Sequence, residues 1–238
     1  MTKRGEAGLT IEENIASIRE RIAAVAGGRT ITLVGATKMN DAEAVRRAVR
    51  AGIDACGENR VQEMLDKLEQ NAYDGAPLHF IGSLQKNKVK FVVGKCSLIH
   101  SVNSTGLLEA INKKAAALDL VQDVLLEINI AREESKTGFM PELLPEILEA
   151  ASQMEHIRVR GLMAIPPKSE KNGENRGYFA QMHELFIDIC TKKYDNIFMD
   201  FLSMGMSNDF EDAILEGANM VRIGTGIFGP RDYGQLKQ

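Results

Sequence analysis

The feature that most constrains this chain is a regular alternation of short apolar runs with segments of helical periodicity. The runs begin eight times, at Ile31, Ile53, Leu78, Leu98, Asp123, Ile157, Phe198 and Met220. The helical segments between them cover residues 41–51, 61–70, 105–117, 141–153, 178–193 and 210–216. Strands that alternate with helical crossovers lie parallel, and eight such units close into a barrel. The sequence therefore predicts an α/β protein, a single (β/α)8 TIM barrel.

An extra helix is expected before the barrel, over about residues 9–26. Ile11, Ile15, Ile18 and Ile22 recur there at helical spacing, and Thr10 with residue 13, a glutamate, forms a capping-box pattern. At 238 residues the whole chain, 1–238, fits one barrel domain. The alternative, a doubly wound open sheet, requires a glycine-rich turn after the first strand, and VGATKMN does not supply it.

The composition narrows the range of partners. A formal net charge of −4 gives no positive field for a phosphate backbone, so nucleic acid is not expected as a partner. The sequence has no apolar window of roughly 20 residues and no secretion signal at its start, which predicts a cytoplasmic protein without a membrane span. Its three cysteines, with no C-x-x-C pair, suggest neither a disulfide framework nor a metal site.

Active sites of α/β barrels lie at the carboxyl ends of the strands, and this criterion selects Lys38 at the end of the first run. A period of two puts Thr32, Val34, Ala36 and Lys38 on one face. If that face is the barrel interior, the Lys38 amine points into the mouth and becomes a usable nucleophile toward an aldehyde. A lysine whose charged end reaches solvent is the alternative.

The last two runs offer candidate partners for that lysine. Arg222 is predicted to point inward from the last strand, where a carboxylate such as Glu127 or a ligand atom would accept its hydrogen bonds. Gly224 and Thr225 follow in a loop position where barrels often bind phosphate, and the preceding strand ends in hydroxyl- and glycine-containing residues 203–207. An amine beside a phosphate cup suits an aldehyde with a phosphate arm: pyridoxal 5'-phosphate, or a sugar-phosphate aldehyde in a Schiff-base aldolase.

Six sequence blocks, in order and covering nearly the whole chain, resemble the pyridoxal phosphate homeostasis protein family, also called the YggS or PROSC family. They are GENRVQE at Gly57, HFIGSLQKNK at His79, EESKTGF at Glu133, RGLMAIP at Arg160, LSMGMSNDFEDAI at Leu202 and VRIGTGIFG at Val221. The resemblance implies an alanine racemase N-terminal-domain-like barrel with no second β domain.

The same resemblance implies roles for individual residues. Pyridoxal phosphate would form a Schiff base with Lys38, its phosphate would be held by Ser203 or Ser207 and by Gly224 and Thr225, and Arg222 would face the pyridine nitrogen. The strand-end criterion adds Asn59 and Met204 to the predicted cofactor-binding residues.

The resemblance further implies a cofactor binder rather than an enzyme. An arginine beside the pyridine nitrogen disfavours protonation of that nitrogen and weakens the ring as an electron sink. We expect buffering and delivery of the cofactor, transient contact with pyridoxal-phosphate-dependent apo-enzymes, and a monomer. The first alternative is an amino-acid racemase whose opposite base is Tyr178, His100 or Lys136. The second is an interaction module whose barrel mouth has lost its function, and the polar segment 166–177 is either a lid or a plain surface loop.

Overall fold

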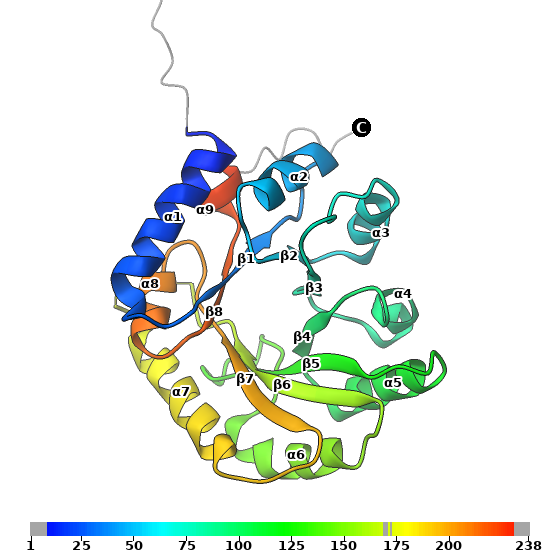
Figure 1. Cartoon of the computed structure of the whole chain (residues 1–238). Coiled ribbons are helices and arrows are strands. Elements are labelled where there is room, and N and C mark those ends of the chain that lie inside the picture. Colours follow the sequence, from blue (N-terminus) through cyan, green and yellow to red (C-terminus); the bar gives the residue numbers. More distant parts are fainter. Residues whose placement is uncertain (1–8, 169–170, 172, 231–238) are drawn as a thin grey trace, which may run out of the picture.

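Eight parallel strands form a closed barrel in the computed structural model, which describes residues 9–168, 171 and 173–230 (Figure 1). Each strand pairs with the next, and the last pairs with the first. The strands are β1 (Thr32–Ala36), β2 (Ala55–Glu58), β3 (Leu78–Phe80), β4 (Leu98–Val102), β5 (Gln122–Ile128), β6 (Ile157–Ala164), β7 (Ile197–Ser203) and β8 (Met220–Ile223). The predicted single (β/α)8 barrel is confirmed.

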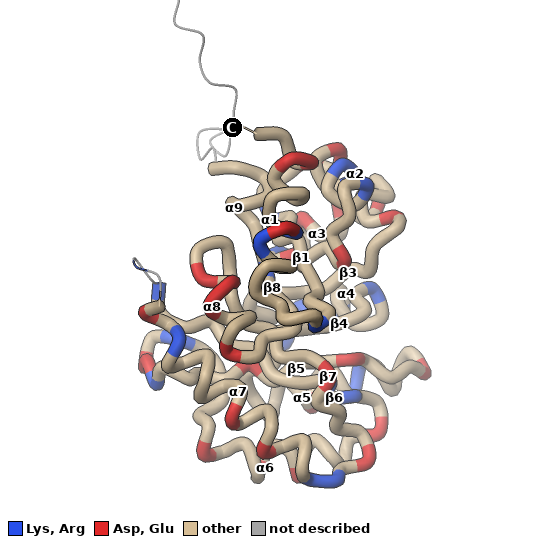
Figure 2. Tube along the Cα trace, turned by 60° about the vertical axis from the view of Figure 1, so that its left-hand side comes forward, with Lys and Arg blue, Asp and Glu red and all other residues tan. Residues whose placement is uncertain are grey.

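The helices form a ring outside the strands (Figure 1). They are α1 (Ile11–Ala26), α2 (Ala42–Arg50), α3 (Val61–Glu69), α4 (Val89–Val92), α5 (Thr105–Ala116), α6 (Leu144–Ser152), α7 (Arg176–Cys190), α8 (Phe210–Leu215) and α9 (Thr225–Phe228), with 3-10 turns at Lys86–Lys88 and Pro141–Leu143. Acidic and basic residues are interspersed over these outer elements (Figure 2). None of the helices in the described part of the chain combines the length and apolar character that crossing a membrane requires.

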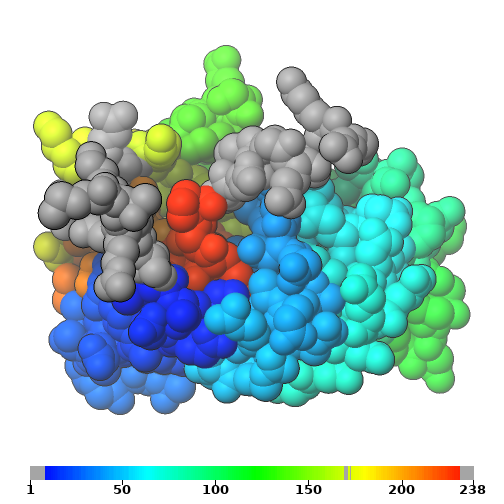
Figure 3. Space-filling view, turned by 90° about the horizontal axis from the view of Figure 1, so that it is seen from above, coloured from blue at the N-terminus to red at the C-terminus, as the bar shows by residue number. Residues whose placement is uncertain are grey.

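The extra N-terminal helix exists as predicted. Thr10 accepts a hydrogen bond from the backbone N–H of Glu13, whose carboxylate accepts from the Thr10 N–H, so the capping box is complete. Ile15, Ile18 and Ile22 bury the inner face of α1. The helix packs against α2, α8 and α9, and Figure 3 shows its dark blue residues beside the red residues of α9. The first and last described elements therefore cover the β8–β1 closure together.

Three of the differences between the predicted and the observed elements concern the site or the crossovers. The first strand stops at Ala36, so Lys38 lies two residues beyond it in a turn. The last apolar run is a strand only as far as Ile223, and Thr225–Phe228 is the short helix α9. Between β3 and β4 the crossover is a 3-10 turn followed by the four-residue α4, which is too short for helical periodicity to indicate.

Two apolar clusters lie on opposite sides of the strand wall. The larger one joins the strands to the surrounding helices and includes Val221 and Ile223. The smaller one fills the barrel interior and includes Val34, Ala36 and Met220. Because successive side chains of a strand point to opposite faces, Arg222 on β8 points into the interior with Met220, as the sequence pattern predicts.

Candidate functional site

A cavity of about 230 Å³ opens at the carboxyl ends of the strands and brings together residues from distant parts of the chain. Six of the residues that the sequence predicts as cofactor-binding line it: Lys38, Asn59, Ser207, Arg222, Gly224 and Thr225. The structure adds lining residues from the segment after β6, namely Ile165, Pro167 and Lys168. Residues 169–170 and 172 of the polar segment 166–177, predicted as either a lid or a plain surface loop, lie outside the described residues.

The structure does not bring Ser203 and Met204 to this cavity. Both side chains are fully buried; Ser203 points into the barrel interior and Met204 belongs to the outer apolar cluster. The Ser203 hydroxyl, which was expected near a phosphate, instead accepts a hydrogen bond from the Arg222 guanidinium. Of the two serines that the sequence left open as phosphate ligands, only Ser207 lines the cavity.

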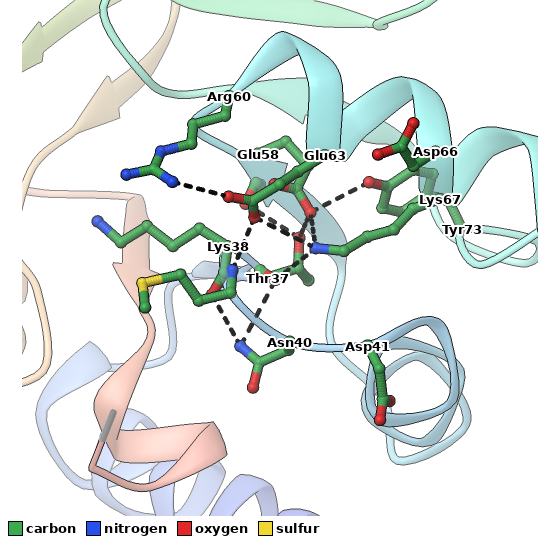
Figure 4. A network of polar contacts seen from close by, with 12 residues as sticks. Thr37, Lys38, Asn40, Asp41, Glu58, Arg60, Glu63, Asp66, Lys67 and Tyr73 are labelled. Atoms are coloured by element: carbon green, nitrogen blue, oxygen red, sulfur yellow. Dashed lines mark hydrogen bonds and ion pairs between the residues drawn. The ribbon is translucent and has the colours of Figure 1, made fainter. Parts of the chain in front are cut away.

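The turn that carries Lys38 is held by hydrogen bonds on both sides (Figure 4). Met39 has a φ of 61°, a left-handed conformation that is uncommon for a residue with a side chain. The Met39 N–H donates to the Glu63 carboxylate at 2.7 Å, and the Asn40 side-chain amide donates to the Lys38 carbonyl at 3.0 Å. These contacts fix the backbone on which the Lys38 side chain stands.

A buried polar network lies behind this turn, between the barrel wall and α3 (Figure 4). The Lys67 ammonium donates to the Glu58 carboxylate at 2.6 Å and to the Thr37 carbonyl at 2.8 Å. The same Glu58 oxygen accepts from the Thr37 hydroxyl at 2.6 Å and from the Tyr73 hydroxyl at 3.1 Å. Burial, followed by the charge of Glu58, raises the pKa of Tyr73. The network therefore fixes the peptide that immediately precedes Lys38.

Arg222 is a buried cation at the floor of the cavity. Its guanidinium donates to the Ser203 carbonyl at 2.9 Å, the Ser203 hydroxyl at 2.6 Å and the Ala164 carbonyl at 3.0 Å. Burial lowers the pKa of Arg222 to about 10, so the side chain keeps its charge at neutral pH. Glu127, one of the predicted acceptors, is hydrogen-bonded to Thr137 instead, and burial raises its pKa.

Two histidines continue this polar cluster across the barrel interior. His100 Nδ1 lies 3.2 Å from the Ser203 hydroxyl, and His100 Nε2 lies 3.1 Å from His79 Nδ1. Burial lowers the pKa of His79 to about 4. Burial, then the neighbouring His79 and Arg222, lowers the pKa of His100 well below its usual value. Both imidazoles are consequently neutral at pH 7.

The loops after β7 and β8 are joined at the opposite side of the cavity. The Ser207 hydroxyl accepts hydrogen bonds from the Thr225 hydroxyl and from the Gly226 N–H, both at 3.2 Å. Asn59 enters from the end of β2, and its Oδ1 atom is buried without a hydrogen-bond partner among the described residues. The residues that line the cavity thus carry an amine, a guanidinium, two hydroxyls and a side-chain amide.

None of the three residues considered as a racemase base lines this cavity. Tyr178 packs against the outer apolar cluster. His100 is fully buried in the interior, and the Lys136 ammonium is paired with Glu133 at 2.7 Å.

This barrel, with a lysine in the turn after β1, belongs to a recognised structural class. Residues 9–232 match the family described as alanine racemase, N-terminal domain. Alanine racemase from Clostridium difficile has the same fold, with a TM-score of 0.71 at 17% identity, over 94% of this chain and 58% of that one. The chain is therefore an alanine racemase N-terminal-domain barrel.

Relatives of matching length narrow the class further. The pyridoxal phosphate homeostasis protein of Aquifex aeolicus is 43% identical over 93% of this chain and 98% of its own. The protein of the same name from Pseudomonas aeruginosa is 41% identical over 94% and 97%. The chain belongs to the pyridoxal phosphate homeostasis protein family.

Solved structures agree with this assignment. PipY from Synechococcus elongatus, which is 32% identical, covers 92% of this chain and 100% of its own length. Its structure without pyridoxal phosphate gives a TM-score of 0.83, and its structure with pyridoxal phosphate bound gives 0.81.

The buried network behind Lys38 leads to a stability prediction. Replacing Lys67 by Met leaves the Glu58 carboxylate buried without its cation, so we expect a loss of about 3–5 kcal/mol in the free energy of unfolding, measured in urea. Lys192→Met breaks a comparable but exposed pair with Asp188 and should leave the free energy of unfolding nearly unchanged. The double variant Lys67→Met with Glu58→Gln should recover at least half of the loss. Equal costs for the two single lysine variants would contradict the assigned role of the network.

The interior histidines predict a pH dependence of stability. The folded-state pKa of His79 is about 4, below the value of about 6.5 expected in the unfolded chain. Between these two pKa values the unfolded state therefore binds more protons than the folded state. The contribution of neutral His79 to the free energy of unfolding is fully present above pH ~6.5 and is lost as the pH falls toward ~4. We expect His79 to account for about 3 kcal/mol of that loss. Urea unfolding of the parent and of His79→Gln across this pH range tests the prediction. The free energy of unfolding should fall less steeply with decreasing pH in the variant, and an identical pH dependence in the two proteins would contradict the assignment.

Proposed function

We propose that this protein binds pyridoxal 5'-phosphate in the cavity at the barrel mouth, with its aldehyde joined to Lys38 as a Schiff base. The observation that carries the proposal is that one cavity is lined by Lys38, Arg222, Ser207 and Thr225. Membership of the pyridoxal phosphate homeostasis family supports it. So does the PipY structure, solved with pyridoxal phosphate bound.

The residues around the cavity fit this cofactor chemically. The Ser207 and Thr225 hydroxyls already meet at 3.2 Å, and the Gly226 N–H adds a third polar group for a phosphate. Gly224 has no side chain to cover its backbone there, although a Cβ added at this position would lie 3.4 Å from that of Ala36, in ordinary van der Waals contact. The Asn59 side chain also lines the cavity, and its amide can hydrogen-bond to a ring hydroxyl. In this assignment the cofactor phosphate lies beside Ser207 and Thr225, and the cofactor ring lies beside Asn59.

The bound cofactor supplies an aldehyde that bonds to an amine and a conjugated ring that withdraws electrons. Arg222 controls the second property. A guanidinium has donors but no acceptor, so it supports an unprotonated ring nitrogen and opposes the protonated form by charge repulsion. We infer that Lys38 holds the cofactor covalently while Arg222 keeps the ring a poor electron sink.

We infer that the protein acts in intracellular homeostasis of the cofactor, buffering it and delivering it to apo-enzymes in the cytoplasm, and not as an amino-acid racemase. The absence of Tyr178, His100 and Lys136 from the residues that line the cavity supports this view. The barrel closes within one chain, which supports a monomeric carrier.

The phosphate end can be tested by comparing two ligands. Thr225→Val and Ser207→Ala should each weaken binding of pyridoxal phosphate about 10- to 100-fold, because hydrogen bonds to charged groups contribute roughly 1.5–3 kcal/mol. Binding of pyridoxal, which lacks the phosphate, should change little. Absorption titrations measure both, with Thr137→Val as a control that removes a hydroxyl outside the cavity. Equal losses for the two ligands would contradict the assignment.

The carrier and racemase alternatives differ in what the loaded protein does next. We expect the loaded protein to restore activity to an apo-enzyme that requires pyridoxal phosphate, and to leave L-alanine unracemised on prolonged incubation. Sustained turnover of L-alanine to D-alanine that disappears in Lys38→Ala would favour the racemase. Failure to bind pyridoxal phosphate at all would favour the interaction module.

A further inference from the structure

Four buried side chains from four strands are linked in a row across the barrel interior. Arg222 on β8 contacts Ser203 on β7, Ser203 contacts His100 on β4, and His100 contacts His79 on β3. Arg222, Ser203, His100 and His79 are exposed by 5%, 0%, 0% and 7%, respectively. The row begins at the cavity that carries Lys38 and crosses to the far side of the barrel.

The first link of this row has a defined direction. A guanidinium is a donor only, so at 2.6 Å the Ser203 hydroxyl oxygen must accept from Arg222. The hydroxyl proton of Ser203 then needs an acceptor of its own. Either that proton goes to His100 Nδ1, or His100 Nδ1 carries a proton and donates it to Ser203, leaving the serine proton without an acceptor.

Two physical effects select the first arrangement. A buried O–H that donates to nothing has lost its hydrogen bond to water without replacement, and no other acceptor contacts the Ser203 hydroxyl within the described residues. In addition, the positive charge of Arg222 favours hydroxyl and imidazole dipoles whose protons point away from it. Both effects place the serine proton on the side of His100.

The remaining hydrogen bond follows from this choice. With Nδ1 of His100 accepting, its Nε2 carries the proton and donates to His79 Nδ1. His79 then carries its own proton on Nε2. That atom is not among the buried side-chain atoms without a partner, and His79 keeps 7% of its surface exposed, so water can accept the last hydrogen bond.

Burial of the two histidines is the main effect that favours this neutral state. Arg222 and the second histidine each oppose protonation of His100. The carboxylates that act on Arg222 are Glu127 and Asp209, which stabilise its positive charge from either side. Protonating His100 on Nδ1 would make the Ser203 oxygen accept from both Arg222 and His100, and the serine proton would be left without an acceptor.

We propose that Ser203 and His100, with His79, are positioning residues that form a relay of fixed direction, Arg222 to Ser203 to His100 to His79, and thereby hold the guanidinium at the cavity floor. The relay deepens the proposed function, since its effect on pyridoxal phosphate rests on that function, whereas the proton positions do not. Ser203 thus acts on the cofactor through Arg222 and not as a phosphate ligand.

The proton positions are tested by ¹⁵N NMR of the imidazoles of the full-length protein without cofactor. The signals of His100 are identified by their loss in His100→Gln. We expect Nδ1 unprotonated and Nε2 protonated, unchanged between about pH 5 and 8. A protonated Nδ1, or a His100 that titrates in this range, would overturn the relay whether or not the protein binds pyridoxal phosphate.

The positioning role is tested by Ser203→Ala, with Ser101→Ala as a matched control. Ser101 is a second buried serine, on β4, whose hydroxyl donates to the Gly82 carbonyl outside the relay. Ser203→Ala should shift the His100 Nδ1 signal, weaken pyridoxal phosphate binding about tenfold and move the absorption maximum of the bound cofactor, and Ser203→Thr should restore all three. Ser101→Ala should change none of them.

The possible failures are distinguishable. If Ser203→Ala leaves the His100 signal and the absorption maximum as in the parent, the relay is wrong while the cofactor site stands. If the parent shows the expected His100 signals but takes up no pyridoxal phosphate, the proposed function is wrong while the relay stands.

Discussion

The pairing of β8 with β1 is the constraint on which the candidate site depends. Val34 lies beside Arg222 and Gly35 beside Ile223 in the register of these two strands, although nearly the whole chain separates them in sequence. This pairing brings the turn with Lys38 next to the loop with Thr225. The helices α1 and α9 pack over the same seam, so the extra N-terminal helix supports the closure that creates the cavity.

Polar groups are buried on both sides of the strand wall near the β8–β1 pairing. Between the strand wall and α3, Lys67 and Glu58 fix the peptide before Lys38. Inside it, backbone carbonyls and Ser203 satisfy Arg222 without a directly bonded carboxylate. An arginine paired to a carboxylate would present less net charge to a ligand, whereas this one faces the cavity as a cation. The same feature that allows cofactor binding therefore argues against strong carbanion chemistry.

Much of this arrangement was predictable from the sequence, because it depends on periodicity and strand order. The alternation of apolar runs predicted the barrel, and the period of two predicted that Arg222 points inward. The ends of the strands predicted that Lys38, Asn59 and Thr225 lie at the site. The fate of Ser203 was not predictable in this way. Ser203 ends β7 as expected, but its hydroxyl accepts a hydrogen bond from Arg222 below the cavity. This contact joins two strands and is visible only in the three-dimensional structure. The histidine pair was missed for the same reason, since His79 and His100 stand on separate strands.

The central claim is that Lys38 is the amine that holds the cofactor. The most direct measurement is borohydride reduction of the protein loaded with pyridoxal phosphate, followed by peptide mapping, in the parent and in Lys38→Ala. The account predicts loss of the Schiff-base absorption band and a stable adduct on Lys38, with no comparable adduct in the variant. No adduct in the parent under excess pyridoxal phosphate, or an adduct that persists on another lysine, would contradict it.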